Sequence, residues 1–449
     1  MLSRSSTTNL PKRLYATAKK SASSSSMPSP VLVEGVRTPF LMSGTQFKEL
    51  MPHELASMAL RGLASRTAMS LSDIDAVIMG NVIQEVKTSN VARESMICAG
   101  YDRSVPAHTI TMACISANQA VSQACNAIRA GQGTAFIAGG VESMSDVPIR
   151  FSRALRKRMI ASQKVKSFPG YMKLLTGLTP GDLAPELPGV AEFTTNETMG
   201  HSADRLCSTW AVSRADQDAY AGRSHASAAK AAASGLLTDI IPVMAPPSGT
   251  AVLSDNGIRG SEADLKKLST LKPSFIKPFG SVTAGNASFL TDGATASLIM
   301  SEERAKSDGL TPMARLGAHV FVGHDPKDEL LLGPAYAICK LLAQEGLTLA
   351  DIDVFEMHEA FAGQVLANCN AISSATFAGQ KGPAPLGVIP MEKLNNWGGS
   401  LSIGHPFGAT GVRLVTTAAN RLKREGGNLA LVAACAAGGQ GTAMLVHAV

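Results

Sequence analysis

The nine residues LSDIDAVIM at positions 71–79 return later in the chain as LADIDVFEM at positions 349–357. A helical pattern of apolar residues precedes each copy, over Glu54–Ala68 and over Ala335–Glu345. Similar segments in the same local order at two places in a chain indicate an internal repeat. The 449 residues therefore predict two copies of one unit, which fits a length above that of a usual single domain.

A second echo supports the repeat. IRAGQG at 128–133 and KREGGN at 423–428 each end a helical pattern, and the apolar runs Ala135–Ala138 and Ala430–Ala433 follow them. Fully apolar runs of this length after helices are typical of strands that are buried on both faces of a sheet. The sequence thus predicts an α/β fold with layered sheets. The stretch from Phe151 to Thr283 is rich in Ser, Pro and charge, and it predicts an inserted loop domain.

The overall charge separates into a terminal part and a nearly neutral remainder. With 45% hydrophobic and 17% charged residues, the composition predicts a folded globular protein. The net charge is +6, but Met1 to Ser26 contain five Lys and Arg and no acid, the pattern of a mitochondrial presequence, here assigned to residues 1–28. Removing five of the 41 basic residues leaves 36 against 35 acidic ones. We therefore expect no nucleic-acid partner.

The sequence gives little support for a membrane-spanning helix, a disulfide framework or a metal site. The uncharged stretch Leu429–Val446 is interrupted by Gly438-Gly439-Gln440-Gly441, which predicts two buried strands rather than a membrane-spanning helix. Seven cysteines without close pairs fit neither a disulfide framework nor a zinc site. The nine histidines do not fall into metal-ligand spacings, so we expect no metal and no cofactor.

A basic segment lies within the predicted insertion. From Arg150 to Lys173 the chain carries eight Lys and Arg and no acid, with Phe151, Leu155, Met159 and Ile160 near helical spacing. A basic amphipathic helix suits an anionic membrane surface, an acidic partner or a polyphosphate ligand. An ordinary solvated surface helix is equally compatible with this pattern.

Cys114 is the first candidate for chemistry. It precedes a helical pattern that ends at Gly131, and the positive end of a helix dipole lowers a thiol pKa and favours the reactive thiolate. We therefore expect Cys114 at a helix start with a lowered pKa. The alternative is a buried structural cysteine, the interpretation we give to Cys125 on the following helix.

Three other segments place reactive side chains in turns or at strand ends. His405 lies in GHPFGATG at 404–411, which lacks the ending of a phosphate loop but suits a general base. A structural turn with a capping histidine is the alternative. Cys435 ends one apolar run, and His358 in HEAF at 358–361 follows another. Active sites of α/β sheets gather at such strand ends, so we expect these side chains to meet.

These segments together resemble the thiolase superfamily, and the resemblance covers the chain after the presequence. VRTPF at 36–40, AGGVESMS at 138–145 and TAGNAS at 283–288, similar to a coenzyme A loop, add to it. Residues 81–94 and 395–402, and His358 where many thiolases have Asn, resemble the β-subunits of mitochondrial trifunctional proteins. The resemblance implies two similar βαβαβαββ domains in a five-layered αβαβα structure. Their expected bounds are 29–310, with the loop domain inserted at about 151–283, and 311–449.

The resemblance also implies an activity, acetyl-CoA C-acyltransferase (3-ketoacyl-CoA thiolase) of mitochondrial fatty acid β-oxidation. Cys114 would be the acyl-accepting nucleophile, His405 its base, Cys435 a second acid and base, and His358 part of an oxyanion hole. The further residues that the resemblance assigns to substrate and coenzyme A are Ser288 at the pantetheine arm, Met199 and Phe361 at the acyl site, and Ala437 as a backbone donor. Coenzyme A is here a substrate.

Partners follow from the same resemblance. Thiolases of this type form homodimers and join an α-subunit with hydratase and dehydrogenase activities in the mitochondrial matrix, and the basic segment adds an anionic inner-membrane surface as a candidate. Acetoacetyl-CoA thiolases and sterol-carrier-type thiolases are the alternatives with the same chemistry. A non-catalytic RNA-binding or scaffold protein is the alternative without it.

Overall fold

The computed structural model describes residues 27–189, 191–377 and 386–449. Residues 1–26 of the predicted presequence lie outside this range, so the presequence stays a prediction. The strands are β1 (Pro30–Arg37), β2 (Leu41–Met42), β3 (Ala76–Gly80), β4 (Ala107–Ile110), β5 (Ala135–Glu142), β6 (Val243–Ala245), β7 (Thr250–Val252), β8 (Thr291–Ser301), β9 (Ala314–Gly323), β10 (Val354–Met357), β11 (Leu429–Ala436) and β12 (Gln440–His447).

The helices stand between and around these strands. They are α1 (Pro52–Thr67), α2 (Val91–Ala99), α3 (Ser116–Arg129), α4 (Arg153–Ser162), α5 (Phe168–Leu175), α6 (Met199–Thr209), α7 (Arg214–Ala233), α8 (Glu262–Leu268), α9 (Glu302–Ser307), α10 (Gly333–Glu345), α11 (Ala362–Ser373) and α13 (Thr410–Glu425), with short 3-10 turns at Pro180–Leu183, Leu349–Asp351 and Met391–Lys393.

The sheet order is mirrored about its centre. The strands run β10-β11-β12-β9-β1-β8-β5-β3-β4, and β2 pairs with β8 outside this path. On each side of the β9-β1 junction the same pattern occurs: a parallel pair, β3 with β5 or β10 with β11, joined to antiparallel strands. The junction itself consists of two residue pairs, Val31 with Arg315 and Leu32 with Ala314. The two echoes in the sequence fall on the two parallel pairs, as the repeat predicted.

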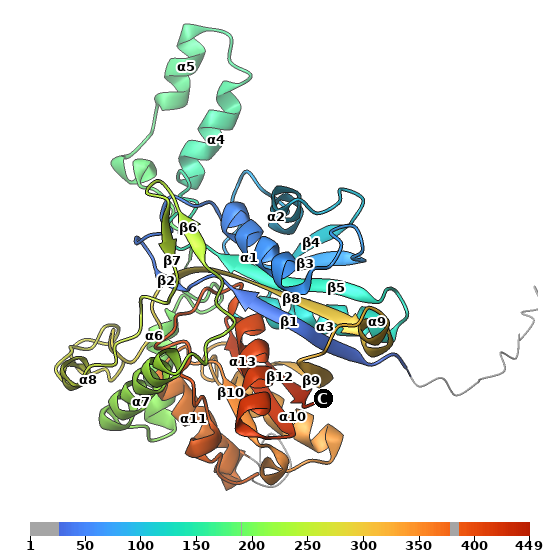
Figure 1. The fold of residues 1–449 in the computed structure, drawn as a ribbon. Coiled ribbons are helices and arrows are strands. Elements are labelled where there is room, and N and C mark those ends of the chain that lie inside the picture. Colours follow the sequence, from blue (N-terminus) through green and yellow to red (C-terminus); the bar gives the residue numbers. More distant parts are fainter. Residues whose placement is uncertain (1–26, 190, 378–385) are drawn as a thin grey trace, which may run out of the picture.

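Three layers of helices alternate with the two half-sheets, which makes five layers in all. α1 and α2 cover the outer face of the N-terminal strands, α10 and α11 cover the C-terminal strands, and α3 packs on α13 between the halves (Figure 1). Alternate strand residues explain how this is possible: Val77 faces the outer core while Ile78 faces the central core. Leu431 and Val432 alternate in the same way in the other half. The layered α/β prediction is therefore confirmed.

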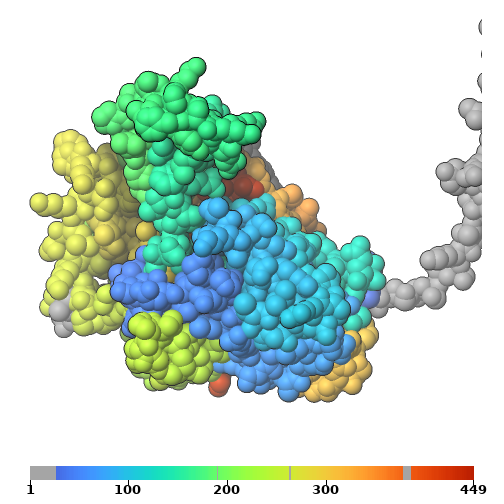
Figure 2. Space-filling model, turned by 90° about the horizontal axis from the view of Figure 1, so that it is seen from above, coloured from blue at the N-terminus to red at the C-terminus, as the bar shows by residue number. Residues whose placement is uncertain are grey.

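The insertion consists of two different parts. α6 and α7 pack on α11 and share the C-terminal core, so this portion is an integral part of the fold rather than a loose covering. α4 and α5 form a hairpin that projects from the body, and neither helix has a buried residue. Seen from above, the green surface of this part of the chain adjoins the yellow segment and continues into the teal residues of the N-terminal half (Figure 2).

The uncharged stretch near the end of the chain forms β11 and β12, which pair antiparallel around the glycine turn. This confirms the prediction of two strands. Within the described ranges, no helix combines the length and the apolar character that a bilayer crossing requires.

Candidate active site

Cys114 lies in a tight turn between β4 and α3. Ala113 has a left-handed backbone with φ 45°, and the hydroxyl of Ser116 accepts from the N–H of Met112 at 2.8 Å and donates to the carbonyl of Ala113 at 2.6 Å. α3 begins at Ser116, two residues after the cysteine. The expected position at the helix start is therefore approximately correct, but Cys114 is not itself a helical residue.

The expected lowering of the Cys114 pKa is wrong. Burial raises the pKa of this thiol to about 12, against the smaller opposing effect of the Ala437 N–H, which donates to the sulfur. The carboxyl of Glu142 raises it further. Loss of solvation outweighs a helix dipole that acts from two residues away. The resting nucleophile is therefore a neutral thiol that must pass its proton to a base when it attacks.

His405 supplies a nearby base. Its backbone follows Gly404, whose φ of 117° is readily adopted only by glycine, and its N–H donates to the hydroxyl of Thr291 at 3.0 Å. Its Nδ1 lies 2.6 Å from the hydroxyl of Thr410. Burial, together with the charge of Arg413, lowers the pKa of His405 to about 3. The ring is thus neutral and able to accept a proton.

His358 extends from the end of β10 toward the same point. Its N–H donates to the carbonyl of Ala433 at 2.8 Å, which continues the parallel pairing with β11. Its Nδ1 lies 2.9 Å from the hydroxyl of Ser400. Burial, the nearby His405 and Arg413 lower its pKa well below the ordinary value. The two imidazole centroids are 4.0 Å apart, with the ring planes inclined by 46°.

The reactive atoms meet, as the sequence predicted. The Sγ of Cys114 and one nitrogen from each of His358 and His405 all lie within 4.8 Å of one another. The Nε2 atoms of both rings are buried and have no hydrogen-bond partner among the described residues. A buried polar atom without a partner marks a place where a substrate atom can bind.

Cys435 completes the group from the end of β11. It is 1% exposed, and burial together with the neighbouring Cys114 raises its pKa. The turn after it contains Gly438 and Gly439, both with positive φ. From the insertion, the carboxylate of Glu192 accepts the N–H of Gly438 at 2.7 Å and holds this turn.

The predicted substrate residues lie on adjoining elements. The N–H of Ser288 donates to the carbonyl of Ala360 at 2.9 Å, so the segment 283–288 runs beside the start of α11. Phe361 is 7% exposed and packs edge-on against Phe275, with centroids 6.2 Å apart. Met199 opens α6 and packs against the C-terminal core. Their contact with a substrate stays a prediction.

Sequence reasoning missed two buried carboxylates that hold the catalytic loops. Glu142 accepts the N–H groups of Val82, Ile83 and Gly408 at 2.9 to 3.1 Å and the side-chain amide of Asn81, and thereby joins the His405 loop to the N-terminal half. Burial raises its pKa to about 7, and the backbone donors oppose this shift. Only its place in the segment 138–145 pointed to it.

Glu359 is the second. It follows His358 and accepts from Tyr220 at 3.0 Å, Ser224 at 2.8 Å, the amide of Asn395 at 2.8 Å and the N–H of Leu401 at 3.2 Å. Two of these donors belong to α7, so the insertion helps to position the His358 segment. Nothing in the sequence pattern identified this role for the insertion.

A thiol and two imidazoles also form a donor set that could hold a soft metal ion such as Zn²⁺. Both Nδ1 atoms already have hydroxyl neighbours, so a metal would use the Nε2 atoms. The expectation that the chain needs no metal therefore stays a prediction.

Comparisons with known proteins identify similar chains and structures. Residues 30–303 match the family model "Thiolase, N-terminal domain", and residues 310–448 match "Thiolase, C-terminal domain". The human trifunctional enzyme subunit beta, mitochondrial, is 56% identical over 434 residues, which cover 96% of this chain and 90% of that protein. A probable 3-ketoacyl-CoA thiolase of Caenorhabditis elegans is 53% identical, covering 96% of this chain and 97% of its own length. The crystal structure of human mitochondrial 3-ketoacyl-CoA thiolase superposes with a TM-score of 0.81 at 29% identity, over 94% of this chain and 99% of that one.

Proposed function

This chain belongs to the thiolase family, and from that membership we propose that it cleaves 3-ketoacyl-CoA with coenzyme A, as an acyltransferase of fatty acid β-oxidation, through Cys114. The observation that carries the proposal is the convergence of the Cys114 sulfur with the two imidazoles within 4.8 Å. Both unpartnered Nε2 atoms are part of that convergence.

In the first half of the reaction, the Nε2 of His405 takes the proton of the Cys114 thiol. The sulfur attacks the 3-keto carbon, and the resulting oxygen anion faces the N–H groups of Cys114 and Ala437. The bond between C2 and C3 then breaks, and its electron pair leaves as the enolate of acetyl-CoA. The imidazolium of His405 and the imidazole of His358 hold the enolate oxygen while the thiol of Cys435 protonates C2.

In the second half, the thiolate of Cys435 takes the proton of an incoming coenzyme A thiol. The coenzyme A sulfur attacks the thioester carbonyl on Cys114, and the same two backbone N–H groups stabilise the oxygen anion. Cys114 leaves as a thiolate and regains its proton from His405. Every group returns to its starting protonation state, and these steps use no group beyond the side chains, the backbone donors and the two substrates.

The family resemblance assigns the substrate contacts. Ser288 would contact the pantetheine arm, and its segment runs beside Ala360 and the start of α11. Met199 and Phe361 would line the acyl site, since both pack at the C-terminal core between α6 and α11.

The test is a thiolysis assay on the purified full chain with 3-ketoacyl-CoA substrates of increasing chain length, alone and with a candidate α-subunit. Formation of acetyl-CoA and of an acyl-CoA shortened by one acetyl unit is the expected result. Activity confined to acetoacetyl-CoA would favour the acetoacetyl-CoA thiolase alternative. No cleavage of any length, with or without the α-subunit, would reject the proposal.

We also propose where this chain is located in the cell and what it assembles with. The similarity to mitochondrial trifunctional β-subunits and the basic, acid-free first 26 residues support mitochondrial import and a matrix location. The similarity also supports association with an α-subunit that carries hydratase and dehydrogenase activities. A homodimer could use β4, the end strand of the N-terminal half of the sheet, because its four residues are all only partly buried.

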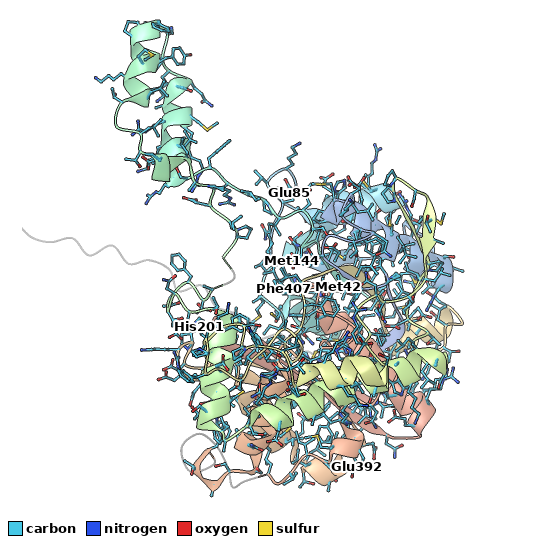
Figure 3. All side chains as sticks on the ribbon, turned by 90° about the vertical axis from the view of Figure 1, so that its left-hand side faces the viewer. Met42, Glu85, Met144, His201, Glu392 and Phe407 are labelled. Carbon is cyan, nitrogen blue, oxygen red and sulfur yellow. The ribbon has the colours of Figure 1, made fainter. Side chains whose placement is uncertain are left out.

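The hairpin of α4 and α5 supports contact with an anionic inner-membrane surface. Its large apolar side chains are exposed, with Phe168 at 77%, Ile160 at 65% and Leu175 at 57%. Arg158 joins the two helices by donating to the carbonyls of Leu174 and Thr176. Figure 3 shows the hairpin standing away from the body with its side chains directed outward. Exposed apolar side chains among basic ones match the interface of an anionic bilayer.

A further inference from the structure

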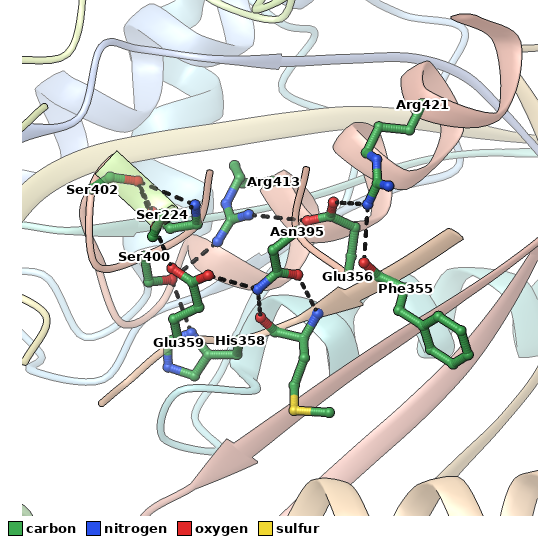
Figure 4. Close-up of polar contacts among 12 residues, drawn as sticks. Ser224, Phe355, Glu356, His358, Glu359, Asn395, Ser400, Ser402, Arg413 and Arg421 are labelled. Atoms are coloured by element: carbon green, nitrogen blue, oxygen red, sulfur yellow. Dashed lines mark hydrogen bonds and ion pairs between the residues drawn. The ribbon is translucent and has the colours of Figure 1, made fainter. Parts of the chain in front are cut away.

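A chain of buried polar side chains connects the ring of His358 to the buried ion pair of Glu356 and Arg421. The Nδ1 of His358 lies 2.9 Å from the hydroxyl of Ser400, and the guanidinium of Arg413 donates to that hydroxyl at 3.0 Å. Arg413 in turn lies 3.6 Å from the carboxylate of Glu356, which also pairs with Arg421 at 2.8 Å. All five side chains are at most 1% exposed (Figure 4).

The direction of each hydrogen bond in this path follows from the donor chemistry. Arg413 can only donate, so the oxygen of Ser400 accepts from it. The hydroxyl hydrogen of Ser400 then has one acceptor in the described part of the chain, the Nδ1 of His358. A buried donor without an acceptor is costly, so this hydrogen points to Nδ1. A neutral imidazole that accepts at Nδ1 carries its own proton on Nε2.

His405 has the opposite arrangement. The hydroxyl of Thr410 donates to the carbonyl of Pro406 at 3.0 Å, so its oxygen accepts from the Nδ1–H of His405 at 2.6 Å. The Nε2 of His405 therefore presents a lone pair. The two adjacent rings thus have different tautomers. The Ser400 hydroxyl accepts from Arg413 and therefore donates to His358, whereas the Thr410 hydroxyl donates to a carbonyl and therefore accepts from His405.

We infer that Ser400, held by Arg413, is a positioning residue that keeps neutral His358 as a hydrogen-bond donor at Nε2 toward the substrate oxygen. This rests on the proposed function for the identity of that oxygen, but the tautomer itself does not depend on it. Glu356 keeps Arg413 in place, and the permanent charge of the guanidinium prevents the hydroxyl from reversing. Burial and Arg413 both keep His358 neutral, as the donor role requires.

The direct test is the tautomer of His358 in the unmodified full-length chain. Long-range ¹H–¹⁵N correlation spectra of histidine-labelled protein distinguish a protonated from an unprotonated ring nitrogen, and the His358 signals are those that vanish in His358→Asn. Protonated Nε2 on His358 and unprotonated Nε2 on His405 are expected. Protonated Nδ1 on His358 would overturn the inference, whether or not the protein cleaves 3-ketoacyl-CoA.

Kinetics then test whether Ser400 acts through His358. Ser400→Ala should lower kcat for cleavage about tenfold to a hundredfold with little change in KM, and Ser400→Thr, which keeps the hydroxyl, should restore most of it. In the His358→Asn background the amide donates without help from a neighbour, so Ser400→Ala should have no further effect. An equal loss from Ser400→Ala in both backgrounds would show a structural role and refute the inference.

Discussion

The rings of His358 and His405 face one another at a centroid distance of 4.0 Å, although one follows β10 and the other precedes α13. Two positive charges at that distance in a buried site would repel strongly. At most one ring can therefore carry a positive charge during the reaction. Since His405 accepts the proton of Cys114 in the proposed mechanism, His358 has to act as a neutral donor throughout.

Replacing His405 by Gln should make stability less dependent on pH. In the folded chain the pKa of His405 is lowered to about 3, below the ordinary value of about 6.5. Between these values the unfolded chain binds more protons, so the free energy of unfolding falls as pH drops. The slope in urea denaturation below about pH 6.5 should decrease in His405→Gln by up to about 1.4 kcal/mol per pH unit. An unchanged slope would contradict the lowered pKa.

Cys114→Ser should reduce thiolysis by about a thousandfold or more and abolish trapping of a labelled acyl group. A hydroxyl is a far weaker nucleophile than a thiol beside the same base. Cys98→Ser is the matched control, because Cys98 is an exposed cysteine of the same half and should change neither measurement. Full activity in Cys114→Ser would remove this residue from the mechanism.

Cys435→Ala should separate the two steps. Transfer of an acyl group from an activated thioester to Cys114 needs only His405, so acyl loading in a single-turnover mass measurement should persist. Cleavage of 3-ketoacyl-CoA needs an acid at C2 and should fall by at least about a hundredfold. If cleavage continued at the normal rate, another group would have to be the acid.

Glu359→Gln should destabilise the fold by about 1–3 kcal/mol. The carboxylate accepts four hydrogen bonds, and an amide would place its own N–H₂ against at least one of these donors. Chemical denaturation measures the change. Glu392→Gln makes the same chemical change at an exposed position shortly before Asn395, and it should alter stability by less than about 0.5 kcal/mol. Equal effects of the two substitutions would show that the buried network does not stabilise the fold.

Charge reversal in the hairpin should weaken membrane binding. Lys157→Glu with Lys164→Glu should reduce sedimentation with anionic vesicles at least about tenfold, because each basic residue near such a surface contributes roughly 1 kcal/mol. Lys48→Glu with Lys423→Glu makes the same charge change elsewhere and should have little effect. Equal, negligible binding of the unmodified chain to anionic and neutral vesicles would exclude the membrane surface.

The sequence predicted the parts of this molecule that local patterns specify. The paired α/β halves were predicted from the repeat of 71–79 in 349–357 and from the apolar runs after Gly131 and Gly426. Buried strands between helices give such runs. The reactive side chains were identified because their four segments together resemble the thiolase superfamily, and because strand ends of α/β sheets are places where active sites gather. These signals are carried by a few adjacent residues.

Other features depend on residues that are distant in the chain and have no chemical signature. Ser400 and Arg413 gain their role only when the fold brings them beside His358. The insertion contributes Tyr220 and Ser224 from α7 and Glu192 from the irregular segment before α6. The raised pKa of Cys114 was missed for the same reason, since the number of atoms packed around a thiol cannot be read from its neighbours in sequence.

The sheet junction between β1 and β9 decides what happens when the chain is divided into its two halves. Cys114 comes from one side of that junction, and His358, His405 and Cys435 come from the other, while Glu142 ties the His405 loop back across it. Neither half of the repeat holds a complete set of reacting groups. A chain truncated between β8 and β9 would therefore lose all activity rather than keep a portion of it, and two separately expressed halves would have to reassemble before any turnover.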